Sequence, residues 1–244
     1  MFRERTNLTR MVDEISKKYS GKLFIIVAEG DKTERNYFKT FRIKYEEDFR
    51  KKDLYFEFLD RENPSQSSPQ AVYQRIQNFC ERLKSKKREI TEDDEFWIVI
   101  DTDDYGNRKE IIEKIAEDCE KPNNYYLALN NPCFEIWLIC HLIDLDTKLG
   151  DCLDDFDEDQ TIQEYIESIG MKGRPKICKT IFTQLHQNKG IGNLYEVLID
   201  RIPEAIPRAK KLGQCCPRSD LYPQKIGTNL YQLFENLGYP ATTS

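Results

Sequence analysis

The chain has 244 residues, of which 39% are hydrophobic and 33% charged, and its formal net charge is −6. This length and composition predict a globular protein with a sizeable core, built as one large domain or as one domain with a smaller companion. A membrane protein is excluded because no apolar run approaches the roughly 18 residues of a membrane span. The N-terminal residues MFRERTNLTR lack the apolar centre of a secretory signal, so we expect a cytoplasmic location and no membrane association.

The eight cysteines are scattered along the chain without a CxxC pair. Such spacing fits neither a zinc site nor a small disulfide framework. We predict reduced, mostly buried thiols.

The charge is unevenly distributed. Residues 144–168 contain ten acidic residues and one lysine, a charge of −9, so the rest of the chain sums to +3. Residues 169–226 hold eleven Lys or Arg against four acids, a charge of +7. The sequence therefore indicates a mildly basic protein with an acidic insert, whose basic stretch is either solvated surface or a polyanion-binding face.

Apolar periodicity predicts the elements in chain order. Residues 7–19 have the spacing of one helical face. Apolar runs then predict four strands, at 22–28, 54–60, 95–101 and 125–130. Helical patterns between them lie at 31–49, 69–87 and 108–118. Alternating strands and helices predict an α/β fold with an open, mostly parallel four-stranded sheet flanked by helices.

The remainder of the chain is predicted to be mainly helical. Asn131 and Pro132 have the types of a helix cap and a first helical residue, and this helix would close a first domain at residues 1–143. The acidic residues 144–160 are predicted to be a linker or loop. Residues 161–244 form a small helical C-terminal region, with helical patterns at 161–169, 175–188, 193–212 and 228–237.

The first strand ends in an acidic residue, Glu29. In an open parallel sheet, ligands bind outside the carboxyl ends of the strands. Gly30 permits a tight departure from the strand, and Asp31 with Glu34 has the spacing of a capping box for the next helix. A carboxylate at this strand end is therefore a candidate to face a metal site.

Two further acids end the third strand, in WIVIDTDDYGN. Asp101 and Asp103 project to the same side as long as the chain stays extended. Magnesium is typically held by one or two carboxylates, with water and substrate phosphate at the other positions. Glu135 lies in the first turn of the helix after the fourth strand, at the same predicted sheet edge. An acid in a first helical turn also has a purely structural explanation.

Basic residues near these positions are candidates to neutralise phosphate. Lys32 and Arg35 lie in the first turns of the helix that follows Glu29, and Lys225 lies in YPQKIGTN. The basic runs at 82–89 and 208–218 are either solvated faces or polynucleotide contacts.

Both histidines have structural explanations that require no catalytic role. His141, on an apolar helix, is expected to be buried with its hydrogen bonds satisfied, and His186 lies near a helix end. Neither is paired with a candidate nucleophile.

Several segments resemble a known family. IIVAEGDKTERNYF, VIDTDDYGN and NPCFEIWLICHL resemble, in order, the segments that characterise the RloB-like family, and IGTNLYQLFENL is a weaker C-terminal match. Glu-Gly after a first strand and DxD after a later one is similar to the Toprim arrangement of topoisomerases, primases and certain nucleases. The resemblance implies a Toprim-like fold, a bacterial origin and a role in restriction loci and abortive-infection phage defence, beside an ATPase partner.

The resemblance also implies roles for individual residues. Glu29, Asp101 and Asp103 match the Toprim acidic positions, and Glu135 matches a family-typical acid. The DxD lacks a glycine immediately after it, which leaves the mode of second-metal binding open.

The resemblance implies magnesium-dependent chemistry on phosphodiester bonds. No tyrosine stands out as a topoisomerase nucleophile and no priming machinery is visible. Hydrolysis is therefore the reaction that requires the fewest additional groups from this chain. We expect a nuclease that uses Mg²⁺ or Mn²⁺ on RNA, tRNA included, or on DNA. The metal would polarise the scissile phosphate while an acid or a second metal activates water.

Two other functions stay open. The main alternative is a non-catalytic partner of a defence ATPase that binds nucleic acid or protein, using the same acidic edge for docking. WIVIDTDD also resembles the aspartate motif of haloacid-dehalogenase phosphatases, but that motif belongs to a leading strand, and here an earlier strand carries Glu29. Whether the chain forms a homo-oligomer stays open as well.

Overall fold

The computed structural model of the chain describes residues 7–30, 32–62, 67–103, 106, 108–121, 124–153, 159–188, 190, 192–212 and 225–239. The chain divides into two compact units. Unit 1 comprises Met1–Val99 and Ile111–Leu127, and unit 2 comprises Ile100–Glu110 and Ala128–Ser244.

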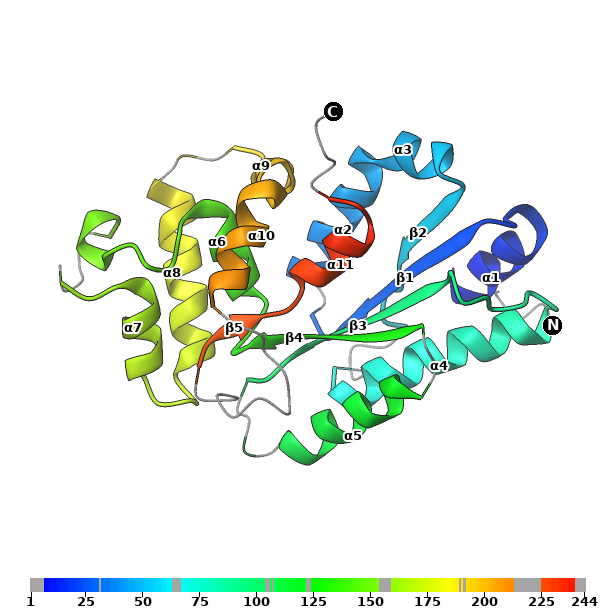
Figure 1. Cartoon of the computed structure of the whole chain (residues 1–244), viewed down its shortest axis with the longest axis horizontal. Coiled ribbons are helices and arrows are strands. Elements are labelled where there is room, and N and C mark those ends of the chain that lie inside the picture. Colours follow the sequence, from blue (N-terminus) through cyan, green and yellow to red (C-terminus); the bar gives the residue numbers. More distant parts are fainter. Residues whose placement is uncertain are drawn as a thin grey trace. The chain divides into compact units, whose positions relative to one another are not determined.

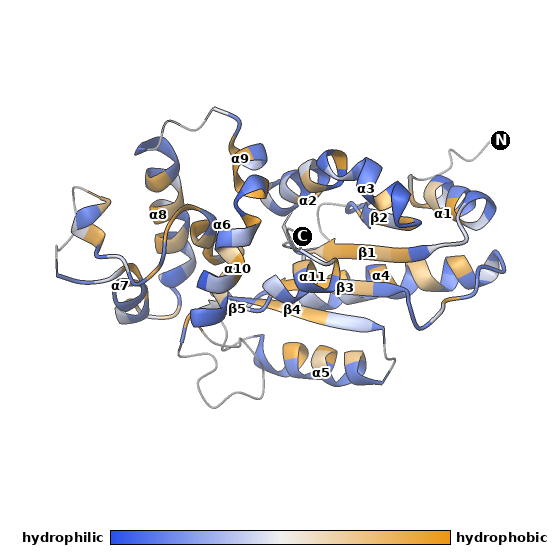
Figure 2. Cartoon of the chain, turned by 45° about the horizontal axis from the view of Figure 1, so that its top comes forward, coloured by the Kyte–Doolittle hydropathy of each residue, from blue (hydrophilic) through white to orange (hydrophobic). Residues whose placement is uncertain are grey.

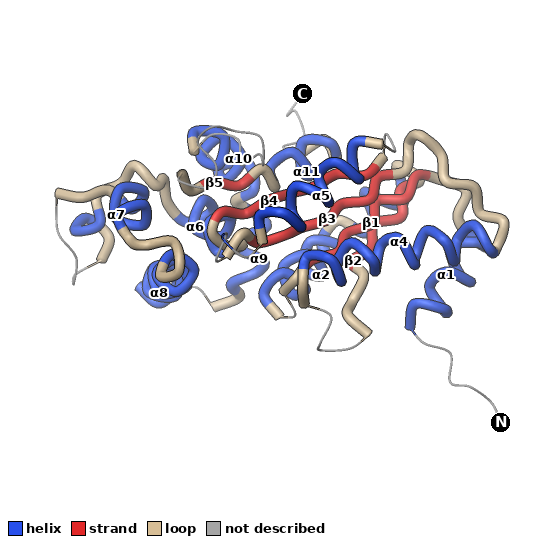
Figure 3. The backbone as a smooth tube through the Cα atoms, turned by 90° about the horizontal axis from the view of Figure 1, so that it is seen from below, coloured by secondary structure: helices blue, strands red, loops and turns tan. Residues whose placement is uncertain are grey.

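The strands are β1 (Lys22–Ala28), β2 (Leu54–Phe58), β3 (Glu95–Asp101), β4 (Tyr125–Asn131) and β5 (Gly227–Thr228). They form a sheet in the order β2-β1-β3-β4-β5, with the strands side by side in red in Figure 3. β1 is parallel to β2 and β3, whereas β4 and β5 are antiparallel. β3 and β4 are parallel, because Phe96 N donates to Asn124 O and Thr102 N to Asn130 O at the same sequence offset.

The predicted α/β fold with a mostly parallel sheet flanked by helices is therefore confirmed. The predicted number of four strands is not, because Gly227–Thr228 adds a fifth strand within a segment predicted to be helical. A two-residue strand carries no hydrophobic period that a sequence pattern could reveal.

The apolar runs of β1 and β3 reflect their burial. Every residue of β1 after Lys22 and every residue of β3 before Asp101 is buried, and Figure 2 shows β1 in orange over most of its length. Strands covered on both faces do not alternate polar and apolar residues. Phe24 of β1 stacks on Phe56 and Trp97, with ring centroids 5.7 Å and 6.1 Å away, so large aromatic side chains fill the core of unit 1.

The helices of unit 1 are α1 (Asn7–Lys18), α2 (Thr33–Lys44), α3 (Glu46–Lys51), α4 (Pro69–Ser85) and α5 (Lys109–Glu120). In Figures 1 and 2, α2 and α3 lie on one side of β1 and β2, and α4 and α5 lie on the other. The single helix predicted at 31–49 is divided at Tyr45 into α2 and α3. Ser68 caps α4 by accepting a hydrogen bond from Ala71 N at 3.2 Å.

Unit 2 is mainly helical around the ends of β4 and β5. Its α-helices are α6 (Glu135–Leu142), α7 (Ile162–Ser168), α8 (Arg174–Asn188), α9 (Leu194–Asp200), α10 (Ile202–Lys211) and α11 (Tyr231–Asn236). The helix predicted at 193–212 is interrupted at Arg201, where α10 starts with Pro203 in its first turn. A capping box of Thr161 and Glu164 starts α7.

Helix α6 forms the centre of unit 2. All eight of its residues are buried, as expected for a helix that is apolar on every side. It packs against α8, α9, α10 and β5, and Trp137 stacks on Phe234 of α11 with ring centroids 5.2 Å apart. His141 Nδ1 donates to Trp137 O at 2.7 Å. The prediction of a buried, satisfied histidine is therefore confirmed.

The predicted start of this helix is wrong. Asn131 is the last residue of β4, and the Asn131–Pro132 peptide bond is cis. α6 begins at Glu135, three residues after the predicted first helical residue, Pro132. Asn131 cannot cap the helix because its side chain is used elsewhere: Nδ2 donates to Lys225 O, and Oδ1 accepts from the Thr102 hydroxyl at 2.8 Å.

In the acidic segment 144–160, the structure describes residues 144–153 and 159–160, and residues 154–158 lie outside the described part. Leu145, Leu149 and Leu153 are buried, and a single 3₁₀ turn, η2, covers Leu149–Asp151. Leu149 N donates to Gln160 O at 2.9 Å. Apolar contacts and backbone hydrogen bonds therefore hold its described parts on unit 2.

Five of the six described cysteines are buried and all six are free thiols, as predicted. The other two, Cys215 and Cys216, lie outside the described residues. None of the helices in the described part of the chain combines the length and apolarity that crossing a membrane requires.

Candidate functional site

Asp101, the last residue of β3, is fixed by a neighbouring amide. Its Oδ1 accepts a hydrogen bond from Asn130 Nδ2 at 3.1 Å. Asn130 is fully buried in β4, and its Oδ1 accepts from the Thr228 hydroxyl at 2.7 Å. A chain of hydrogen bonds from Thr228 through Asn130 thus sets the orientation of the Asp101 carboxylate.

The fifth strand, β5, supplies the Thr228 hydroxyl for this contact. Asn130 and Thr228 are directly paired between β4 and β5, and the Thr228 hydroxyl also accepts from Leu230 N at 3.1 Å. Sequence reasoning missed both residues as site residues. Two polar residues in the sequence could have indicated them: Asn130 and Asn131 end an otherwise apolar strand. A buried amide side chain must find hydrogen-bond partners.

Asp103 does not continue the strand. Its φ of 41° lies in the left-handed region, which aspartate tolerates better than most residues. Its backbone N donates to Pro132 O at 2.9 Å. The expectation that Asp101 and Asp103 share one side of an extended chain is therefore wrong, because the chain turns sharply after Thr102.

Arg108 holds the two aspartates together in another way. Its Nη1 donates to the backbone oxygen of Asp101 at 3.0 Å, and its Nη2 lies 3.2 Å from Asp103 Oδ2. The Asp103 side chain is 37% exposed, so its carboxylate is accessible from solvent while paired. Asp104, which follows Asp103 in the sequence, lies outside the described residues.

Glu135 is the first residue of α6 and is 8% exposed. As predicted, it lies in the first turn of the helix after β4. The positive end of the helix dipole at that turn favours a negative charge, which helps to explain how an acid is tolerated in so buried a position.

Helix α8 packs against the turn that precedes Glu135. Cys133 Sγ lies 3.9 Å from Pro175 O in the first turn of α8, and the Cys133 and Cys178 side chains are hydrogen-bonded to each other. Both thiols are fully buried. Lys179 follows Cys178, so this packing brings its side chain to the same part of unit 2.

Lys179 is a site residue that the sequence pattern did not indicate. Burial by itself lowers the pKa of this lysine. Its negative neighbours are Glu135, Asp101 and Asp103, with the Cys133 thiol beside them. They outweigh burial and raise the pKa of Lys179 above its usual range. One ammonium group therefore interacts with all three candidate carboxylates of unit 2.

In unit 1, Glu29 directly follows β1 and is 7% exposed. Ala28 before it is paired with Val99 of β3. The buried Arg75 of α4 donates to Ala28 O at 3.4 Å and to Leu59 O at 3.3 Å, which brings a positive charge to the ends of β1 and β2.

Gly30 has a steric role that the sequence did not reveal. A Cβ built on Gly30 would overlap the carboxyl group of Glu34, which is buried in the first turn of α2. The N-cap of α2 is Lys32, without a side-chain hydrogen bond to the helix. Asp31, the other half of the predicted capping box, lies outside the described residues.

The predicted phosphate-binding residues differ in their partners. Lys32 is exposed at the start of α2. Arg35 Nε lies 2.8 Å from Asp60 Oδ1, and Lys225 Nζ lies 2.8 Å from Glu167 Oε2. Arg35 and Lys225 are therefore neutralised by carboxylates of their own units.

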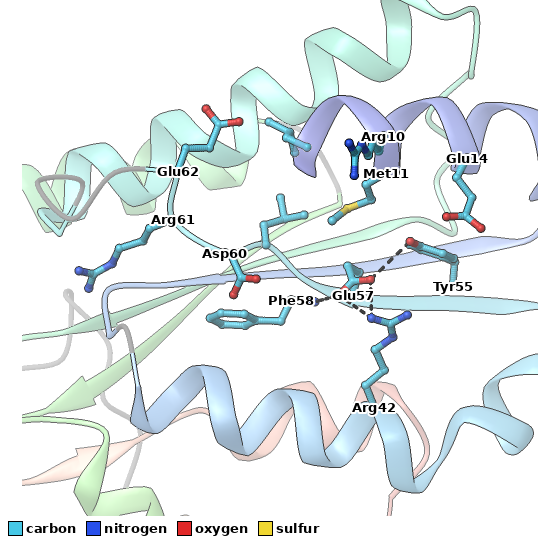
Figure 4. Close-up of a pocket in the computed structure, with 12 residues that line it drawn as sticks. Arg10, Met11, Glu14, Arg42, Tyr55, Glu57, Phe58, Asp60, Arg61 and Glu62 are labelled. Carbon is cyan, nitrogen blue, oxygen red and sulfur yellow. Dashed lines mark hydrogen bonds and ion pairs between the residues drawn. The ribbon is translucent and has the colours of Figure 1, made fainter. Parts of the chain in front are cut away.

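A cavity of about 500 Å³ lies along β2 in unit 1, and none of the predicted site residues lines it. Figure 4 shows Arg42 of α2 pointing toward Glu57 and Tyr55 of β2, with Arg10 and Met11 of α1 across the cavity. Arg42 Nη1 lies 2.9 Å from Glu57 Oε1. The acids of this cavity are paired with basic residues, Glu57 with Arg42, Asp60 with Arg35 and Lys39, and Glu62 with Arg82, so the cavity gives no reason to move the candidate site to unit 1.

The chemistry of the unit 2 carboxylates fits a divalent cation. Magnesium prefers oxygen ligands and usually takes only one or two carboxylates from a protein, which Asp101 and Asp103 supply. Within the described residues, no group of three or more His, Cys, Asp or Glu could enclose a metal ion. A cation at this position would therefore take at most two carboxylates from the described residues, with water at its other positions.

Comparison with known proteins identifies the family. No curated protein and no solved structure matches the chain significantly. The model of the family described as "RloB-like protein" matches residues 24–237, which includes most of β1, the strand-end acids and the Thr228 segment. This match covers most of the chain, and the protein therefore belongs to the RloB-like family.

Proposed function

We propose that the protein is a metal-dependent nuclease of Toprim type that hydrolyses phosphodiester bonds of RNA or DNA as an effector of bacterial anti-phage defence. The defence role and an ATPase partner are expectations from the family resemblance. The observation that carries the catalytic proposal is that Arg108 bridges Asp101 and Asp103 at the end of β3, while Asn130 orients the Asp101 carboxylate. Acids at the carboxyl ends of parallel strands, with a cation among them, suit phosphoryl chemistry.

Asp101 and Asp103 would hold Mg²⁺ or Mn²⁺. When bound, such a cation polarises the scissile phosphate and stabilises the leaving oxygen. The residues around it have separate tasks. Asn130 keeps one oxygen of Asp101 engaged and so leaves the other in a defined direction. Arg108 keeps Asp103 in its left-handed turn.

Glu135 and Lys179 complete the proposed chemistry. Glu135 is held at a helix start and is suited to accept a proton from the attacking water. Lys179 is suited to neutralise a phosphate oxygen, because the ammonium group already lies among these acids. Glu29, in unit 1, enters the proposal through the family resemblance as a further acid or metal ligand.

The test is cleavage of tRNA, single-stranded and duplex substrates with Mg²⁺ or Mn²⁺. We expect Asp101→Asn and Glu29→Gln each to reduce cleavage by roughly 100-fold or more, since each removes a charge that acts on the transition state. Asp146→Asn, the same change at an exposed position of unit 2, is the control and keeps full activity. Activity that survives both site substitutions refutes the nuclease assignment.

A second measurement does not depend on activation by a partner. Titration of Mn²⁺ followed by electron paramagnetic resonance should detect bound ion in the wild type and in Asp146→Asn, and weaker binding in Asp101→Asn. Equal Mn²⁺ affinity in all three proteins would contradict the metal site and favour a non-catalytic docking role for the acidic residues.

A further inference from the structure

The exposed face of α8 carries a row of lysines. Lys172 precedes the helix, and Lys176 and Lys179 follow at intervals of four and three residues, the spacing of neighbours on one helical face. The opposite face, with Cys178, Ile181 and Leu185, is buried. We call Lys172, Lys176 and Lys179 the α8 lysine row.

This row is not explained by helix stability. α8 has no acidic residue, and its first turn already contains Arg174, which is buried and donates to backbone oxygens of Ile169 and Glu167. Cations at a helix N-terminus oppose the helix dipole and destabilise the helix. Repulsion between like charges adds to this effect.

Most cations of the other basic runs have internal partners. In residues 82–89 the ion pairs are Arg82–Glu62, Lys86–Asp13 and Arg88–Asp94, and in residues 208–212 they are Lys210–Glu235 and Lys211–Asp144. Lys84 and Lys87 of the first run are exposed and, like Lys176, make no ion pair or side-chain hydrogen bond within the described part of the chain, but they belong to unit 1. The α8 lysine row is the better candidate because it belongs to the same unit as Asp101, Asp103 and Glu135.

The row also leads to the candidate site. Its last member, Lys179, interacts with Glu135, Asp101 and Asp103. Figure 1 shows α8 running beside α6, against which it packs and whose first residue is Glu135. Lys176 and Lys179 lie about 4.5 Å apart along the helix direction, at 1.5 Å per residue, and Lys172 lies in the turn just before the helix. A strand whose scissile phosphate lies at Lys179 would meet Lys176 and Lys172 with its next phosphates.

We propose that the α8 lysine row binds the sugar–phosphate backbone of the nucleic acid and guides the strand to the unit 2 carboxylates. This inference rests on the proposed nuclease function and adds the surface that holds its substrate. Contacts of this kind carry no sequence information, so we expect affinity that depends on charge and salt, and little dependence on base sequence.

Binding can be tested without cleavage. Fluorescence anisotropy of labelled single-stranded RNA, single-stranded DNA and duplex DNA is measured with the full chain in EDTA, over a range of NaCl concentrations. Lys176→Gln should weaken binding several-fold, and Lys172→Gln/Lys176→Gln by roughly 10-fold or more. Each neutralised contact should lower the slope of log affinity against log salt by about 0.7 to 0.9.

Lys17→Gln/Lys114→Gln is the matched control, since both lysines are exposed on helices of unit 1 and lie outside the basic runs. An affinity and salt slope that are the same in the row variant and in this control would overturn the inference. Binding of poly-L-glutamate through the row, with no binding of nucleic acid, would assign it to an acidic protein and also overturn it. Loss of cleavage in Asp101→Asn with unchanged binding would leave the row intact, so the two proposals fail separately.

Discussion

Glu57 in unit 1 and Asp101 in unit 2 are both acids on strands, yet their surroundings differ. Glu57 is 6% exposed, and its carboxylate meets Arg42 at 2.7 Å, Phe58 N at 3.2 Å and the Tyr55 hydroxyl at 3.4 Å. Asp101 meets a neutral amide, and it shares the charge of Lys179 with Asp103 and Glu135. Glu57 has one arginine to itself, whereas Asp101, Asp103 and Glu135 share Lys179, and Arg108 pairs with Asp103.

The comparison shows that burial of an acid does not by itself indicate a site. A buried acid with its own arginine and backbone donor is satisfied, and it contributes to the structure of unit 1. An acid oriented by an amide, in a group with more carboxylates than cations, keeps negative charge available for an added cation. The following experiments test whether this distinction holds.

The largest effect is expected at His141, the fully buried ionisable group of unit 2. Burial lowers its pKa to about 3, so it is neutral when folded and titrates near 6.5 when unfolded. Its stabilisation is therefore complete above pH 6.5 and is lost as the pH falls toward 3. We expect the unfolding free energy of the wild type to decline relative to His141→Leu by up to about 1.4 kcal/mol per pH unit in this window.

Urea unfolding at pH 4, 5, 6 and 7 measures this difference. His186→Leu changes the only other histidine, which is half-buried near the end of α8, and should keep the wild-type pH dependence. A difference between wild type and His141→Leu that does not change with pH would mean that His141 is protonated in the folded chain.

The next effect compares two arginines. Arg42→Met leaves the Glu57 carboxylate buried without its cation, and we expect a loss of about 2 kcal/mol in unfolding free energy with cleavage unchanged. Arg108→Met should cost less than about 1 kcal/mol, because water can solvate Asp103, but should reduce cleavage. Urea unfolding and the nuclease assay on both variants check this, and the reverse pattern would invalidate the distinction between the two clusters.

A smaller effect is expected from the hydroxyl that orients Asn130. Thr228→Val keeps the shape of the side chain but removes the donor, at a cost of about 1 kcal/mol in unfolding free energy. Loss of an orienting partner typically reduces activity by roughly 10-fold or more. Thr91→Val, at an exposed loop threonine, serves as control. Cleavage equal to wild type in Thr228→Val would show that the orientation of Asp101 does not limit catalysis.

The smallest effect concerns the titration of Glu57. Burial raises its pKa above the ordinary value of about 4.3, although Arg42 acts in the opposite direction. A raised pKa means that its contribution to stability is complete at low pH and is lost as the pH rises through the folded-state pKa. Glu57→Gln should therefore gain stability relative to wild type between pH 4 and pH 8, by less than about 1 kcal/mol. A constant or falling difference in urea unfolding would contradict this.

Much of the fold was readable from local patterns. Continuous apolar runs predicted β1 and β3 with the bounds observed, since strands buried on both faces need no polar positions. The location of Glu29 and Asp101 at strand ends followed from the same runs. The bounds of α6 did not follow, because Asn131 extends β4 and is held by contacts with Thr102 and Lys225.

The features that sequence reasoning missed all depend on contacts between distant residues. Thr228 and Asn130 are 98 residues apart, and two strand residues leave no periodic signal. Lys179 belongs to an ordinary amphipathic helix, and only the packing of Cys133 against Pro175 brings it to the acids. The left-handed turn at Asp103 depends on Pro132 and Arg108, which no DxD spacing reveals.

The separation between Asn130 and Thr228 has a consequence for biosynthesis. A ribosome makes β3, β4 and α6 long before it makes β5, so a nascent chain holds Asp101 while the hydroxyl that aims it is still missing. An enzyme that cuts nucleic acid would be dangerous to the cell while it is still being translated. Under the proposed nuclease function, the site around Asp101 therefore gains this orienting group only after β5 has been made.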